Sequence, residues 1–96
     1  MEKKVKRYVY LVTIGYESTN EADQYVYSSL SKAKRKMREK LKYFLLGSNC
    51  YKSEIRPDIV VHDFRDAGET YFNVPQENED GIEDNVFGRI EKKELL

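Results

Sequence analysis

The chain has 96 residues, 17 of them Lys or Arg and 17 Asp or Glu, so its formal net charge is zero. This length allows one modest hydrophobic core and excludes two. No apolar run approaches the ~20 residues that cross a bilayer, and the charged residues 1–7 precede no apolar signal segment. The single cysteine, Cys50, cannot form an internal disulfide. We expect one cytoplasmic domain over residues 1–96, with no membrane contact.

The first elements along the chain form a predicted β-hairpin. Residues 5–16 (VKRYVYLVTIGY) and 24–28 (QYVYS) are rich in β-branched and aromatic side chains, a composition typical of strands. The intervening residues 17–23 are polar and fit a loop. Because the connection is short, the two strands should pair antiparallel.

A helix is predicted over residues 30–46. Its apolar residues recur every three or four positions and form one stripe: Leu30, Ala33, Met37, Leu41 and Phe44. Ser29 is a plausible N-cap because its hydroxyl can accept a hydrogen bond from the first turn. Gly47 is expected to end the helix in a left-handed conformation.

The rest of the chain predicts three short strands, at residues 58–64, 70–74 and 85–91, separated by polar connections. Pro75 is expected to end the second of these strands, and Gly88 to mark a bulge in the third. Residues 48–57 and 76–84 are predicted loops, and residues 92–96 a tail. The order β-β-α-β-β-β predicts a two-layer α+β fold, one antiparallel sheet with a helix on one face. The pattern leaves open which face that is.

Charge is divided unevenly along the chain. Residues 1–45 hold 11 Lys/Arg and 5 Asp/Glu, net +6, whereas residues 46–96 hold 6 and 12, net −6. The predicted helix carries the candidate binding residues Lys32, Lys34, Arg35, Lys36, Arg38 and Lys42. A solvated helix usually gains from alternating signs, so this one indicates an external anionic partner. The alternative is neutralisation by the chain's own acidic loop.

Two further groups of side chains are candidate surfaces. The hairpin carries the candidate aromatic surface Tyr8, Tyr10, Tyr25 and Tyr27. Tyrosine is common in interfaces and stacks on unpaired bases. The alternative is that this face is the core, with the hydroxyl groups reaching the edge of the sheet. The late loop carries the candidate acidic surface Glu77, Glu79, Asp80, Glu83 and Asp84. This acidic strip could imitate a phosphate backbone, or it could simply be solvated. Its spacing does not fit a calcium-binding loop.

Catalysis is poorly supported by the sequence. The single histidine, His62, lies in a strand pattern near Asp63 and Asp58, and acid–base work with either aspartate is the alternative to a structural histidine. One His and one Cys supply too few ligands for a typical zinc site. There is no Gly-rich phosphate-binding loop. We expect no enzymatic activity, no metal and no cofactor.

The stretch from Val9 to Ala33 (VYLVTIGY…QYVYSSLSKA), together with IEKKEL at 90–95, resembles a loose group of small hairpin-helix-strand proteins of Gram-positive bacteria and their phages. The resemblance covers about half the chain and implies no functional residue. It implies a mobile-element product, of the kind that inhibits host defence or nucleic-acid machinery.

The leading hypothesis is therefore a non-enzymatic binding protein, a phage-type inhibitor that engages a host protein or ribonucleoprotein. One alternative is direct binding of nucleic acid through the basic helix. Another is a self-associating structural domain that forms a homodimer through the open face of its sheet.

Overall fold

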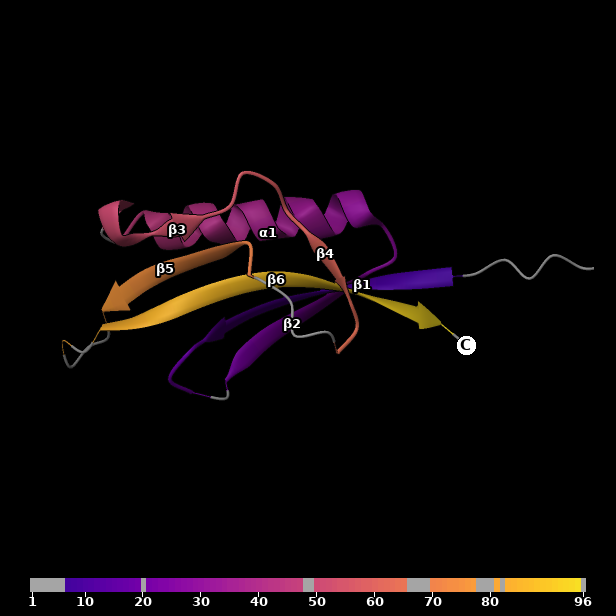
Figure 1. Ribbon diagram of the computed structural model, residues 1–96, viewed down its shortest axis with the longest axis horizontal. Helices are drawn as coiled ribbons and strands as arrows, with labels where there is room; N and C mark the ends of the chain where they lie inside the picture. The colour runs from indigo at the N-terminus through magenta and orange to yellow at the C-terminus, as the bar shows by residue number, and fades with distance from the viewer. Residues whose placement is uncertain are drawn as a thin grey trace, which may run out of the picture.

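The computed structural model describes residues 7–19, 21–47, 50–65, 70–77, 81 and 83–95. Within these residues one α-helix packs on one sheet, so the predicted two-layer α+β fold is confirmed (Figure 1). The helix is α1 (Leu30–Leu45), and a short 3-10 turn, η1 (Cys50–Lys52), follows it. The strands are β1 (Arg7–Tyr16), β2 (Ala22–Tyr27), β3 (Glu54–Ile55), β4 (Val61–Asp63), β5 (Phe72–Glu77) and β6 (Glu83–Leu95).

The long strand β6 lies at the centre of the sheet. The spatial order is β2-β1-β6-β5-β3, and β4 also pairs with β6. On one side β6 pairs antiparallel with β1 along 86–95. On the other side it pairs antiparallel with β5 and then parallel with β4. The sheet is therefore antiparallel except at β4.

The strand predicted over 85–91 lies within β6, but the predicted tail was wrong, because the mostly charged residues 92–95 continue β6. They pair with the first residues of β1, where Tyr8 lies opposite Glu94 and Tyr10 opposite Lys92. The Lys92 ammonium also lies 4.0 Å from the centre of the Tyr8 ring. Residues 92–95 therefore form a strand because they pair with β1, about 80 positions earlier in the chain, although their composition is typical of a solvated chain end.

The helix prediction is confirmed to within one residue. Ala33, Met37 and Leu41 are its buried residues and form one face. Its ends differ from expectation. The Ser29 hydroxyl makes no capping bond and instead lies 2.9 Å from the Ser31 hydroxyl. The predicted left-handed conformation of Gly47 is wrong, because the backbone φ of Gly47 is not positive.

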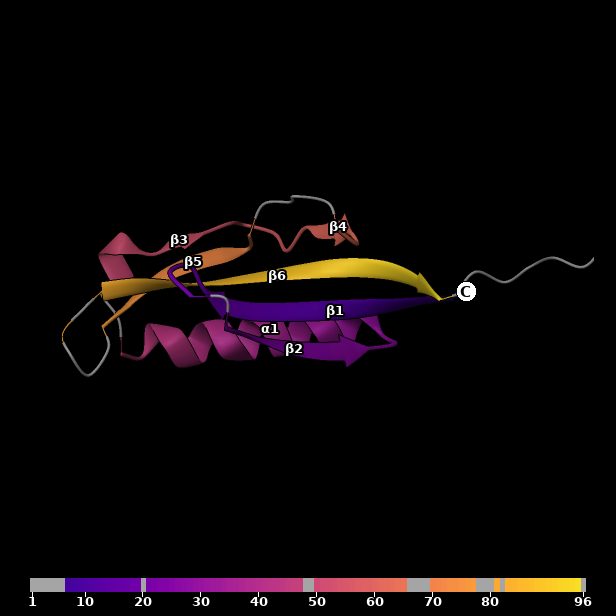
Figure 2. The same ribbon diagram turned by 90° about the horizontal axis from the view of Figure 1, so that it is seen from below.

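The helix covers the face of the sheet that carries the tyrosines, and Figure 2 shows it along one side of β1 and β6. The buried core between the layers consists of Val12, Ile14, Ala33, Met37, Leu41, Phe72, Val74, Val86 and Ile90. Tyr10, Tyr25 and Tyr27 are partly buried against it. Three of the four predicted tyrosines therefore contribute to the core with part of their side chains.

Gly88 allows the helix to approach β6 closely. A Cβ atom at this position would lie 2.6 Å from Met37 Sδ and would also overlap the Phe72 ring. The β1–β6 register runs through Gly88 without an extra residue, so the predicted bulge is wrong. Glycine is needed here because any side chain would fill the space of the core residues.

The middle of the chain departs most from prediction. The expected strand 58–64 is shortened to β4, and the expected loop 48–57 contains η1 and β3. Pro75 does not end β5 but lies within it, opposite Asn85. It is tolerated because β3 pairs with Phe72 and Asn73, and none of the described strands pairs with the outer edge of β5 at the proline, where the missing N–H costs little.

Candidate binding surface

A groove between α1 and the edge strand β2 gathers basic and aromatic side chains. Its volume is about 250 Å³, and it is lined by Tyr27, Lys32, Arg35, Lys36 and Glu39. Tyr27 comes from β2, on the face that α1 covers. The other four residues lie on consecutive turns of the helix flank that faces β2. The groove therefore presents three cations and one carboxylate beside a tyrosine.

The ring of Tyr25 joins β2 to the same flank of the helix. The Lys36 ammonium lies 4.7 Å from its centre and the Lys40 ammonium 5.6 Å. These cation–π contacts hold two lysines at the rim of the groove. Because both ammonium groups lie over the ring, less of Tyr25 is open to stack on a base.

The six predicted basic residues do not form one surface. Lys32, Arg35 and Lys36 line the groove. With about 3.6 residues per turn, Lys34 and Arg38 project from the other flank of the helix, whereas Lys42, seven residues after Arg35, lies near the solvent-facing side between the two flanks. The cations of α1 are thus divided, and the flank beside β2 combines them with aromatic rings.

The four predicted tyrosines are also divided. Tyr25 and Tyr27 border the groove, whereas Tyr10 packs against the core and Tyr8 holds Lys92 near the end of β6. Sequence reasoning missed Lys40 and Tyr43 as members of the surface. Tyr43 is 66% exposed, and the Lys40 ammonium lies 5.8 Å from its ring centre. Their i,i+3 spacing was the available signal.

The prediction of a loop over 76–84 was wrong at both ends, because residues 76–77 belong to β5 and residues 83–84 to β6. The described acidic residues at these strand ends contact other parts of the chain. The Glu83 carboxylate lies 3.5 Å from the Lys52 ammonium, and Asp84 accepts hydrogen bonds from Ser18. Glu77 ends β5, while Glu79 and Asp80 lie outside the described residues. In the described part of the chain, the ion pair of a helix cation is the local one between Lys36 and Glu39, at 3.9 Å.

Asp84 is the carboxyl group whose ionisation the fold perturbs most clearly. The Ser18 hydroxyl donates to its carboxylate, and the Asn85 and Ser18 amides add further hydrogen bonds. Together these bonds lower the pKa of Asp84, the Ser18 hydroxyl having the largest effect and partial burial opposing it. The charged form of Asp84 thus ties the β1–β2 loop to β6.

The sheet face away from the helix holds a polar cluster that sequence reasoning also missed. Glu91 is only 5% exposed and accepts a hydrogen bond of 3.1 Å from the Arg65 amide. Arg89 Nε lies 3.1 Å from Glu91 Oε1, an ion pair that lacks hydrogen-bond alignment. His62 lies opposite Glu91 in the parallel β4–β6 register. This placement results from long-range pairing, which sequence spacing does not reveal.

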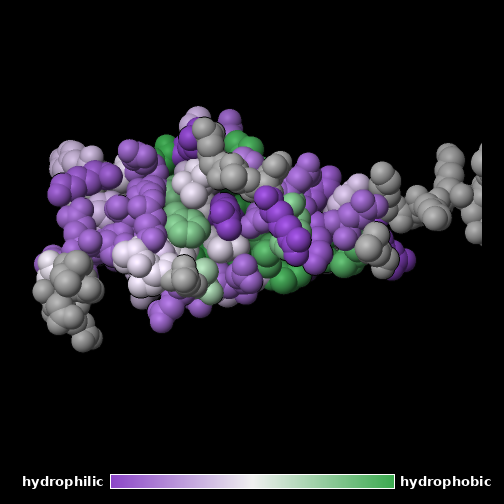
Figure 3. Space-filling view, turned by 60° about the horizontal axis from the view of Figure 1, so that its bottom comes forward, coloured by the Kyte–Doolittle hydropathy of each residue, from purple (hydrophilic) through white to green (hydrophobic). Residues whose placement is uncertain are grey.

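The same face carries apolar side chains near β2. Strand alternation places Val9 and Leu11 on it with Val26, and Val26 is 64% exposed. Figure 3 shows apolar side chains gathered among hydrophilic ones on the side of the molecule away from α1.

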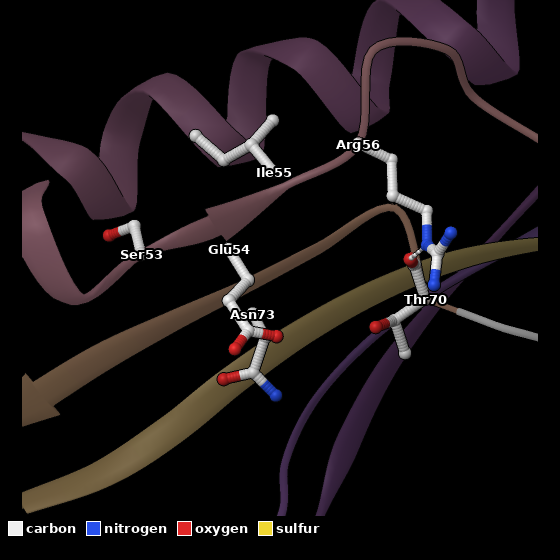
Figure 4. Close-up of a pocket in the computed structure, with 6 residues that line it drawn as sticks. All are labelled: Ser53, Glu54, Ile55, Arg56, Thr70 and Asn73. Carbon is white, nitrogen blue, oxygen red and sulfur yellow. Dashed lines mark hydrogen bonds between the residues drawn. The ribbon is translucent and has the colours of Figure 1, made fainter.

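A second groove, of about 380 Å³, lies at the β3–β5 edge (Figure 4). Arg56 Nε donates to the Thr70 carbonyl at 3.1 Å, and the side chains of Glu54 and Asn73 point towards each other. Its lining combines one acid with one base. Although larger, this groove lacks the concentration of one charge that distinguishes the groove beside β2, which is therefore the better candidate site.

No protein-family model, curated protein or solved structure matches the chain. The helix of the described part is not long and apolar enough to cross a membrane. The function must therefore be inferred from the geometry of the groove.

Proposed function

We propose that this chain is a non-enzymatic binding protein whose groove beside β2 engages an acidic segment of a protein partner. The observation that carries the proposal is the groove itself, where Lys32, Arg35 and Lys36 surround Tyr27. Among the described residues, no acidic side chain from outside α1 forms an ion pair with these cations. The counter-charge is then supplied by a partner.

The state of the tyrosine rings favours carboxylates over bases as the recognised groups. Binding of single-stranded nucleic acid usually relies on aromatic rings that are open for stacking. Here the Tyr25 ring is already covered by Lys36 and Lys40, and Tyr27 is partly buried against the core. The groove is small and basic, and it suits one or two carboxylate side chains. The resemblance of 9–33 to phage proteins favours an inhibitory role against a host protein.

Fluorescence anisotropy with a labelled ten-residue poly-glutamate peptide tests this proposal at 50 mM salt. We expect micromolar binding that weakens as salt rises, because exposed charge pairs are screened. The double variant Arg35→Glu with Lys36→Glu should weaken binding at least tenfold. The matched control, Lys34→Glu with Arg38→Glu, changes the net charge equally on the other flank and should weaken it less than threefold.

Two results would overturn the proposal. Equal losses in the two double variants would mean that the peptide responds to net charge and not to the groove. Tighter binding of a labelled ten-nucleotide oligo-dT than of the peptide, with the groove variant again the weaker, would assign the groove to nucleic acid. Circular dichroism of each variant establishes that the helix is retained.

A further inference from the structure

The free edge of β2 carries a pattern suited to a second copy of this chain. Among the described strands, β2 is the last of the sheet on its side. The Tyr16 amide donates to the Glu21 carbonyl, and antiparallel hydrogen bonding alternates along a strand. The backbone groups of Ala22, Gln24 and Val26 therefore point away from β1, towards solvent. An unpaired edge of this kind is a template for another strand.

The acidic and the aromatic side chains of β2 lie towards opposite ends of the strand. Asp23 lies opposite the core residue Ile14, so it is on the face that α1 covers, and alternation places Glu21 on the same face. Both acids are exposed. The other end of β2 carries Tyr25 and Tyr27, which border the basic groove. One strand thus presents acids at its start and a basic, aromatic groove at its end.

We propose that two copies associate through β2, antiparallel, with Gln24 opposite Gln24 of the second copy. In this register Asp23 of one copy faces Tyr25 of the other, where Lys36 and Lys40 lie over the ring. Glu21 faces Tyr27 and the groove. Directly opposed side chains have Cβ atoms about 5 Å apart, so each acidic end meets the basic groove of the other copy.

The opposite face of the strand fits the same register. Val26, which is 64% exposed, would lie opposite Ala22 of the second copy and lose contact with water. A shift by two residues would place it against Gln24 instead. A shift by one residue would direct the backbone groups of β2 away from those of its copy. The charge pattern, the apolar pair and the backbone alternation therefore favour one pairing.

The helices leave room for this arrangement. α1 lies along β1 and β6 (Figures 1 and 2), about two strand spacings from the proposed two-fold axis. With strands about 4.8 Å apart, the two helix axes would be roughly 19 Å apart, compared with a helix diameter of about 10 Å including side chains. The space between them would contain the lysines of both copies and the acids that neutralise them. An external acidic partner and a second copy would then compete for the groove.

Sedimentation equilibrium of the full chain at 50 mM salt, without any ligand, tests the dimer. We expect a micromolar dissociation constant that increases at least tenfold at 500 mM salt. Glu21→Lys with Asp23→Lys should give a monomer, and so should Lys36→Glu with Lys40→Glu. Combining all four substitutions exchanges the charges across the interface and should restore the dimer.

A second variant tests the strand edge independently of charge. Gln24→Pro removes an N–H that points away from β1, so it should abolish the dimer while the circular dichroism spectrum is retained. A wild-type chain that is monomeric at 200 μM in 50 mM salt overturns the proposal. So does a dimer that survives both the charge variants and Gln24→Pro, which would assign the contact to the open sheet face. Neither result bears on peptide binding by the groove.

Discussion

The two faces of the sheet are built from alternate residues of the same strands, yet they are closed in different ways. On the helix side, Val12 and Ile90 are fully buried beneath α1, in a layer of apolar side chains. On the other side, Thr13 and Glu91 are almost as deeply buried, but no helix in the described part of the chain covers them. Glu91 is closed by the segment after β4, through the Arg65 amide, and by Arg89 beside it.

This difference indicates where stability and binding should reside. Apolar burial against a rigid helix is tightly packed and tolerates no added volume. The other face is closed by a short segment and a partly exposed ion pair, so it can accommodate added volume with a smaller loss in the free energy of unfolding. The helix flank that remains outside both faces carries the groove, so its charges can be changed without disturbing the core.

The largest expected effect comes from adding one methyl group to the face of the sheet that the helix covers. Gly88→Ala places a Cβ against Met37 Sδ, 2.6 Å away, and against the buried Phe72 ring. We expect a loss of about 3 kcal/mol in the free energy of unfolding, the upper part of the usual range for overpacked cores. Urea denaturation monitored by circular dichroism measures it.

Gly15→Ala is the matched control on the open face. Its Cβ would lie 3.0 Å from Cζ of Phe87 and 3.1 Å from the Ala22 Cβ. Phe87 is only half-buried, so its ring can turn towards solvent, and we expect a loss below about 1 kcal/mol. Equal losses at the two glycines would show that the faces are packed alike and would remove the distinction between them.

The next effect concerns the charge buried on the open face. Glu91→Gln removes the anion beside Arg89 and puts an amide near the Arg65 N–H, leaving polar groups without suitable partners. A loss of about 1–2 kcal/mol is expected, again from urea denaturation. Glu94→Gln, at an exposed position of the same strand, should change stability by less than about 0.5 kcal/mol. No difference between the two would mean that the segment after β4 does not close this face.

These cases also show which features could be predicted from the sequence. The hairpin and α1 depend on local signals, namely alternation over 5–16 and the spacing of Ala33, Met37 and Leu41, and both were confirmed. The role of Gly88 and the burial of Glu91 depend on which strands pair, information that no short window of sequence contains. The cations of the groove were predicted, because their place on one helix flank follows from their spacing. That they lie beside Tyr27 depends on which face of the sheet the helix covers, which the sequence left open.

The smallest expected effect is a pH-dependent change in stability. It arises outside both faces, where the β1–β2 loop contacts β6. The folded state lowers the pKa of Asp84, chiefly through the hydrogen bond from the Ser18 hydroxyl. A lowered folded-state pKa adds stability that is present above the unfolded-state value, about 4, and is lost as pH falls through the folded-state value. The difference in melting temperature between wild type and Asp84→Asn should therefore be constant from pH 7 to about 5 and disappear in more acidic solution.

Ser18→Ala provides the control, because it removes the main donor and leaves the carboxyl group in place. The difference in melting temperature between Ser18→Ala and wild type should decrease over the same acidic range, since the hydrogen bond favours the ionised form of Asp84. Differential scanning calorimetry from pH 7 to pH 2.5 measures both. A gap between wild type and Asp84→Asn that persists unchanged at pH 2.5 would mean that the side chain acts through packing instead of charge.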